Sequence, residues 1–359
     1  MGHRREQHLG WQVILPLIIL TVGATPLLAQ EPPSRPSVGD ADTLDARSFF
    51  EVAMRRGSRA AAYWASRLEP DDPRYVYLMY VIQRRGARNP EQVAALDSVY
   101  DAVLTRDPFP YIDGPCFVLP NIERERDPAI AGILYLFGNC HAQATEKFAE
   151  GLARDPSALQ LHFWRGQSFY FRREYRAARA ELTILIDSLR ARDEERTSRV
   201  YLSKAFLEYA VGAAAQRAGA MRDAGEAYGR ALTEDMSYYM AHARLGDVAA
   251  AQSNLAEAAR EYVQAVEIKP DDGVLRFRYG VILLRANRLA DAEVQLREAV
   301  RLEPHWLEPY GQLAVALDRQ NKTDEAVAMY RAYAVRVPLR LSSRRDQALA
   351  RAAELETGS

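Results

Sequence analysis

Small residues recur along the chain at a fixed interval, within stretches whose apolar positions follow helical spacing. They mark the same point in six successive segments: Gly132, Gly166, Gly212, Gly246, Gly280 and Ala314. Four of the five intervals between them are 34 residues, and the other is 46. Self-similarity with a period of about 20–50 residues is typical of stacked repeats. The pattern therefore predicts a repeat protein built from one helical unit.

Each marker is followed by two further apolar positions. An alanine comes twelve residues later, at Ala144, Ala178, Ala224, Ala258, Ala292 and Ala326. A large residue follows four positions on, at Phe148, Leu182, Tyr228, Tyr262, Leu296 and Tyr330. Glycine inside a helix costs about 0.5–1 kcal/mol relative to alanine. Its recurrence predicts that two helices approach closely there, with the later large residue, one turn beyond the alanine, filling the space between them.

Helix-breaking residues divide each segment into two helices. Proline closes four of the six segments, at Pro156, Pro270, Pro304 and Pro338. Polar residues or glycine fall near the middle, at Gly138-Asn139, Arg172-Arg173, Gly219, Ser253-Asn254, Asn287 and Asn321. These residues terminate helices or favour turns. Each segment therefore predicts a pair of antiparallel helices.

This pattern resembles the tetratricopeptide repeat family over residues 125–340, although the tryptophan that the family places near the start of each repeat is absent. The resemblance implies an all-α fold, a right-handed superhelical solenoid of helix pairs with a concave inner face. Its six repeats would span 125–158, 159–204, 205–238, 239–272, 273–306 and 307–340. The twelve extra residues of the second interval predict either longer helices, roughly 174–191 and 196–218, or a surface loop.

The flanking regions predict capping structures. Residues 45–124 are interpreted as degenerate helical repeats that cap the stack, with two short helices each in 45–69 and 73–106. Residues 107–124 contain four prolines and should be irregular. At the other end, 341–359 should form a capping helix.

The amino terminus has the pattern of a secretory signal. Arg4 and Arg5 precede an apolar run that ends at Ala29, a small residue typical of cleavage sites. Residues 1–29 are therefore predicted to be a signal peptide, or alternatively an uncleaved membrane anchor, and 30–44 a flexible tether. The protein is expected in the periplasm or cell envelope of a bacterium, or anchored in the inner membrane.

The net charge and the missing sequence motifs disfavour several classes of function. The 47 basic and 48 acidic residues leave a net charge of −1, which disfavours non-specific nucleic-acid binding. The common nucleophile, phosphate-loop, dinucleotide and zinc-protease motifs are absent from the sequence, and the six histidines lack metal-ligand spacing. We expect neither a cofactor nor a metal. An enzyme or small-molecule binder that uses Cys116 is the remaining alternative.

The two cysteines, Cys116 and Cys140, lie 24 residues apart. In an oxidising compartment they would form a disulfide that ties 107–124 to the first clear repeat. The alternative is two separate buried thiols.

The resemblance also implies where a partner binds, because the first helix of each tetratricopeptide pair lines the groove. The partner-binding candidates are Phe163, Gln167, Tyr170, Phe206, Tyr209, Arg217, Asp247, Phe277, Arg285 and Arg319. The aromatic residues could instead belong to the core between repeats, and the three arginines could be solvated charges. The sequence thus predicts a non-enzymatic scaffold that binds a protein or peptide of the cell envelope, or a membrane-anchored assembly factor of the same fold.

Overall fold

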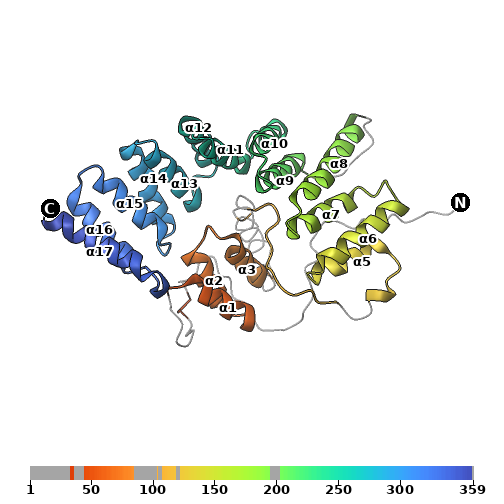
Figure 1. Ribbon diagram of the computed structural model, residues 1–359, viewed down its shortest axis with the longest axis horizontal. Coiled ribbons are helices and arrows are strands. Elements are labelled where there is room, and N and C mark those ends of the chain that lie inside the picture. The colour runs from red at the N-terminus through yellow and green to blue at the C-terminus, as the bar shows by residue number, and fades with distance from the viewer. Residues whose placement is uncertain are drawn as a thin grey trace.

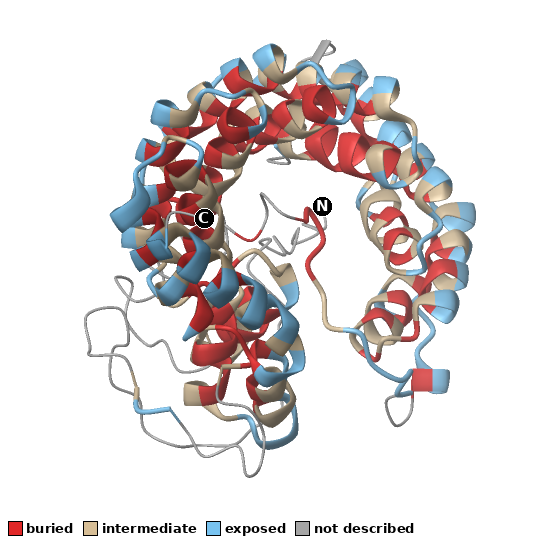
Figure 2. Cartoon of the chain, turned by 60° about the vertical axis from the view of Figure 1, so that its left-hand side comes forward, coloured by how far each residue is buried: buried red, intermediate tan, exposed pale blue. Residues whose placement is uncertain are grey.

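The protein is an α-solenoid, seen in a computed structural model that describes residues 33–35, 44–84, 103, 107–118, 122–194 and 203–357. The regular elements in these ranges are helices. Successive helices pack against one another along an arc (Figure 1), and the buried residues lie between the helix layers (Figure 2). The sequence-based fold class is confirmed.

Helix pairs form the body of the arc. The first helices of the pairs are α5 (Pro128–Phe137), α7 (Gln160–Phe171), α9 (Lys204–Arg217), α11 (Tyr239–Ala251), α13 (Gly273–Arg285) and α15 (Glu308–Asp318). Their partners are α6 (His141–Arg154), α8 (Tyr175–Glu194), α10 (Met221–Glu234), α12 (Leu255–Ile268), α14 (Leu289–Leu302) and α16 (Thr323–Ala334). A last helix, α17 (Ser342–Thr357), follows the short η2 (Leu339–Leu341) and packs on α16.

The repeated glycines lie where the second helix of a pair crosses the first. A Cβ atom on Gly212 would come within 2.5 Å of the Tyr228 ring, and one on Gly246 within 2.7 Å of the Tyr262 ring. Gly132, Gly166 and Gly280 face the equivalent large residue in their own pairs. The six repeated alanines are fully buried. Small residues therefore set the spacing within each pair.

The turn between paired helices uses a left-handed backbone. Positive φ angles occur at Asn139, Arg173, Ser253, Asn287 and Asn321, and at Gly219 in the third repeat. These positions follow the last turn of a first helix, where such a residue reverses the chain. The polar breaks of the sequence therefore fall at the hairpin turns.

The second repeat is longer than the others. Helix α8 continues to Glu194, three residues beyond the predicted end, whereas α9 begins at Lys204. The Ser203 hydroxyl accepts a hydrogen bond from the Phe206 amide and caps α9, so this helix is shorter than predicted. The predicted start at residue 196 lies outside the described residues.

The described helices before the repeats contact the later part of the solenoid, and their capping role stays a prediction. The region contains α1 (Ala46–Arg56), α2 (Arg59–Leu68) and α3 (Pro73–Arg84), followed by irregular chain over 107–118 and by η1 (Ile122–Arg124). Helix α2 reaches the far end of the solenoid, where Arg67 pairs with Glu303 at 3.3 Å. This ion pair and the ring contact of Trp64 with His305 connect α2 to the later repeats.

The predicted signal or anchor, residues 1–29, and most of the predicted tether lie outside the described residues. Within the described ranges, no helix has the length and apolar character that a membrane span requires.

Candidate protein-binding surface

A segment of the chain itself lies on the inner face of the solenoid. We call residues 107–113 the strap. The Asp107 carboxylate accepts a hydrogen bond from Arg217 Nη2 at 2.7 Å. The Phe109 side chain is 2% exposed and is surrounded by the rings of Phe163, Tyr170 and Phe206, at centroid distances of 5.7, 5.2 and 6.2 Å. Three of the predicted groove aromatics therefore bind the protein's own strap.

The far end of the strap is also fixed. The Tyr111 ring stacks on Phe171 at 4.2 Å, and its hydroxyl donates to the Phe171 carbonyl at 3.4 Å. Cys116 and Cys140 form a disulfide with a Cα–Cα distance of 4.6 Å. The structure therefore has the first of the two cysteine arrangements, in which Cys116 carries no free thiol.

Burial shapes the electrostatics of the strap contact. It raises the pKa of the Asp107 carboxyl, and the nearby Arg217 charge opposes that change. Burial likewise raises the pKa of the Tyr170 hydroxyl. Opposite charges attract each other more strongly where part of the surrounding water is excluded. Arg217 therefore binds an internal ligand, the carboxylate of Asp107, while its own side chain stays 45% exposed.

A second contact joins the loop between α2 and α3, residues 69–72, to the later repeats. Asp71 pairs with Arg278 Nη2 at 2.6 Å. Glu69 and Asp45 both pair with Arg340, at 3.2 and 2.9 Å. The Trp64 indole meets the His305 ring edge-on at 4.9 Å.

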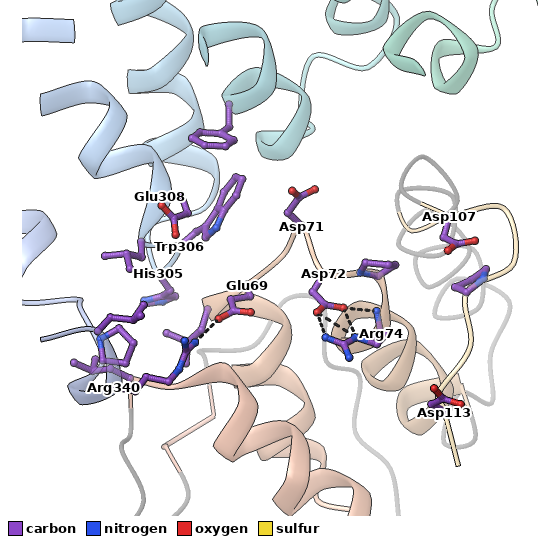
Figure 3. Close-up of a pocket in the computed structure, with 18 of the residues that line it drawn as sticks. Glu69, Asp71, Asp72, Arg74, Asp107, Asp113, His305, Trp306, Glu308 and Arg340 are labelled. Atoms are coloured by element: carbon purple, nitrogen blue, oxygen red, sulfur yellow. Dashed lines mark hydrogen bonds and ion pairs between the residues drawn. The ribbon is translucent and has the colours of Figure 1, made fainter. Parts of the chain in front are cut away.

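These contacts enclose a central cavity of about 930 Å³ between the strap, the α2–α3 loop and the last repeats (Figure 3). Acidic side chains project from the loop and the strap, and aromatic and basic ones from the later repeats. Figure 3 shows Trp306 and Glu308 on one side and Asp107 on the other, with Asp71 between them. The cavity thus presents both signs of charge beside the half-buried rings of Tyr111 and Phe277.

A second pocket of about 510 Å³ lies on α11, α12 and α13. Asp247 accepts hydrogen bonds there from the Tyr262 hydroxyl at 2.5 Å and from Arg278 at 3.4 Å. Phe277, which also lines the central cavity, and Arg285 complete the wall. The described part of the chain has no acidic cluster or histidine–cysteine group that could hold a metal ion.

The remaining candidates have mainly structural contacts. Tyr209 is fully buried and cannot touch a partner, because its ring packs against Tyr228 and Tyr238. Arg319 donates to the Leu284 carbonyl at 3.1 Å. Gln167 is half-buried on α7.

Sequence reasoning missed the strap, Asp71 and Arg278. The one available signal was the unusual Asp107-Pro-Phe109-Pro stretch in a region that is otherwise irregular. Nothing in its spacing connects it to residues one hundred positions away.

The stacked helix pairs define an α-solenoid. Residues 249–308, from the end of α11 to the start of α15, match the tetratricopeptide repeat family model. The chain therefore contains tetratricopeptide repeats.

Several solved structures are similar. MamA is 17% identical, with a TM-score of 0.42 over 48% of this chain and 94% of that one. The carboxyl-terminal part of a repeat protein from Cytophaga hutchinsonii is 15% identical, with a TM-score of 0.48 over 57% and 77%. YrrB, described as a repeat protein with an unusual peptide-binding site, is 18% identical, with a TM-score of 0.41 over 55% and 95%. A search of curated proteins found no match.

Proposed function

We propose that this protein is a non-enzymatic scaffold that holds a segment of a partner protein on the inner face of its solenoid. The observation that carries the proposal is the central cavity of about 930 Å³, which opens beside a second pocket and shares Phe277 with it. Arginine and aromatic side chains line both, and these residue types contribute most to binding energy at protein interfaces. Repeat solenoids use such concave surfaces to bind extended chains.

We also propose that the protein works in the bacterial cell envelope. The charged start, apolar run and small-residue exit of residues 1–29 support export. The Cys116–Cys140 disulfide supports an oxidising compartment. In the alternative form, the same segment remains as an anchor in the inner membrane.

Site-specific photo-crosslinking in the native host tests the scaffold. A photoreactive amino acid replaces Val281, which lines the second pocket, or Val294 on α14, which is 62% exposed and outside both cavities. We expect a discrete crosslinked protein from position 281 and none from position 294. Equal products from both positions, or none from 281, would exclude a partner on the inner face.

Amino-terminal sequencing of the protein from its own host tests the location. A mature start near Gln30 in a soluble envelope fraction is the expected result. An intact amino terminus that stays with membranes after carbonate extraction would instead establish the anchored form, and a cytoplasmic location would refute both.

A further inference from the structure

The strap displays the chemistry that the inner face recognises. Asp107 supplies a carboxylate to Arg217, and Phe109, two residues later, inserts its ring between α7 and α9. The Phe109 amide also donates to the Asp107 carboxylate at 3.0 Å, which fixes the short turn between the two side chains. A carboxylate followed two residues later by an aromatic ring is therefore a ligand that this surface binds.

The repeat symmetry places a second site of the same design between α11 and α13. Arg217 stands five residues after Gly212, and Arg285 stands five residues after Gly280. The two arginines thus occupy the same repeat position. Within the described residues Arg285 donates only to the Ala250 carbonyl, at 3.4 Å, and no carboxylate pairs with it.

The second site lacks two of the aromatic rings that surround Phe109 in the first site. The positions of Phe163 and Tyr170, three before and four after Gly166, are taken by Ala243 and Ala250 around Gly246. The methyl group in place of the second ring leaves room, because Ala250 lines the 510 Å³ pocket, whereas Ala243 is buried in the core and does not line it. The half-buried Phe277 ring flanks that space and offers it an aromatic surface, whereas the Tyr262 ring is buried beneath it.

Arg285 is the guanidinium group of this pocket that can meet an acidic ligand. The other one, Arg278, already pairs with Asp71 at 2.6 Å and with Asp247 at 3.4 Å. Asp247 is already engaged by Tyr262 and Arg278. Arg285 keeps guanidinium donors that its single carbonyl contact does not use.

We infer that the pocket between α11 and α13 binds an extended segment of the partner that carries a carboxylate two residues before a large aromatic residue. The carboxylate pairs with Arg285, and the ring enters the space beside Ala250. This inference rests on the proposed scaffold function and specifies the chemistry of its partner.

Fluorescence anisotropy with synthetic peptides tests it on the full chain with its disulfide intact. One labelled peptide has the sequence of residues 105–113, with tryptophan in place of the phenylalanine to suit the larger pocket. A second has asparagine in place of the acidic residue that corresponds to Asp107. Charge-assisted hydrogen bonds contribute about 1.5–3 kcal/mol, so losing one should weaken binding about tenfold or more.

We expect Arg285→Gln to weaken the first peptide about tenfold and to leave the asparagine peptide unchanged, because both changes remove the same contact. The matched control is Arg319→Gln, which alters the same repeat position outside the pocket and should bind both peptides as the wild type does. Ala250→Phe should abolish binding by filling the pocket, with circular dichroism confirming that the helices remain.

Other outcomes overturn the inference. These are no binding by the wild type, binding that Arg285→Gln leaves unchanged, or binding that depends on Arg217 because the peptide replaces the strap. A partner crosslinked from position 281 together with any of these results would preserve the scaffold function and refute only the recognition chemistry. If neither a crosslinked partner from position 281 nor peptide binding were found, both proposals would be refuted.

Discussion

The same substitution at two glycines tests the packing of the repeats. A Cβ atom on Gly212 in α9 would lie 2.5 Å from a carbon of the Tyr228 ring. That ring is fully buried, and its hydroxyl donates to Gln216 at 2.8 Å, so it cannot swing aside without losing this bond. Gly229 in α10 has no atom within 4 Å of the corresponding position. The methyl group of alanine would therefore clash with the Tyr228 ring at position 212 and extend into open space at position 229.

The two substitutions should change stability in opposite directions. Alanine gains about 0.5–1 kcal/mol over glycine inside a helix, and at Gly229 this is the whole effect. At Gly212 the extra methyl group overpacks the crossing, which costs about 1–3 kcal/mol. The net result there is a loss of up to about 2.5 kcal/mol once the propensity gain is subtracted.

Thermal and urea unfolding followed by circular dichroism measure the difference. One kcal/mol shifts Tm by about 2–4 °C in domains of about 150–250 residues, and by less in longer chains. We expect Gly229→Ala to raise Tm and the urea midpoint, and Gly212→Ala to lower both. A rise in both proteins would show that the repeated glycines do not set the spacing of the paired helices.

Three further predictions concern the strap and the last helix. Phe109→Ala removes a buried ring and should cost about 3–5 kcal/mol locally, seen as faster amide exchange in the strap; unchanged exchange would contradict its anchoring role. Replacing Cys116 and Cys140 by serine should cost about 3 kcal/mol in the chain-entropy model, and reduction of the wild type should add the mass of two hydrogens, whereas an unchanged mass would argue against the disulfide. Hydrogen bonds from Arg351 lower the pKa of Asp318 in the folded protein below its ordinary 3.8. The ionised Asp318 therefore stabilises the fold above pH 3.8, and this stabilisation is lost as the pH falls through the lowered pKa of the folded state. Arg351→Gln should make the amide-exchange protection of α17 less dependent on acid pH. The effect should be small because solvent screens the pair. Equal acid sensitivity of the exchange in both proteins would contradict the prediction.

The repeats could be predicted from the sequence because each copy contacts mainly its neighbours. The interval from Gly212 to Tyr228 recurs in every pair, so one crossing explains all of them. The turn residues were visible for the same reason, since Asn287 and Asn321 hold the same left-handed position one repeat apart. The packing within each helix pair can therefore be predicted from the repeating residue spacing.

The candidate site could be predicted only in part because its decisive contacts do not repeat. Arg217 and Arg285 occupy one repeat position, yet one binds Asp107 and the other a backbone carbonyl. The difference comes from the strap, a segment outside the periodic region. Equivalent repeat positions can also differ in burial. Tyr209 shares the repeat position of Phe163, which contacts the strap, but Tyr209 is buried against Tyr228 and Tyr238.

The two segments that lie across the inner face are held by different forces. The strap is fixed by the buried Phe109 ring and by a disulfide, which act at any salt concentration. The α2–α3 region depends largely on ion pairs, and in the pair of Arg340 with Glu69 the side chains are 47% and 40% exposed. Exposed pairs contribute about 0–1 kcal/mol each and weaken as salt screens them. Added salt should therefore weaken the contact of the α2–α3 loop more than that of the strap.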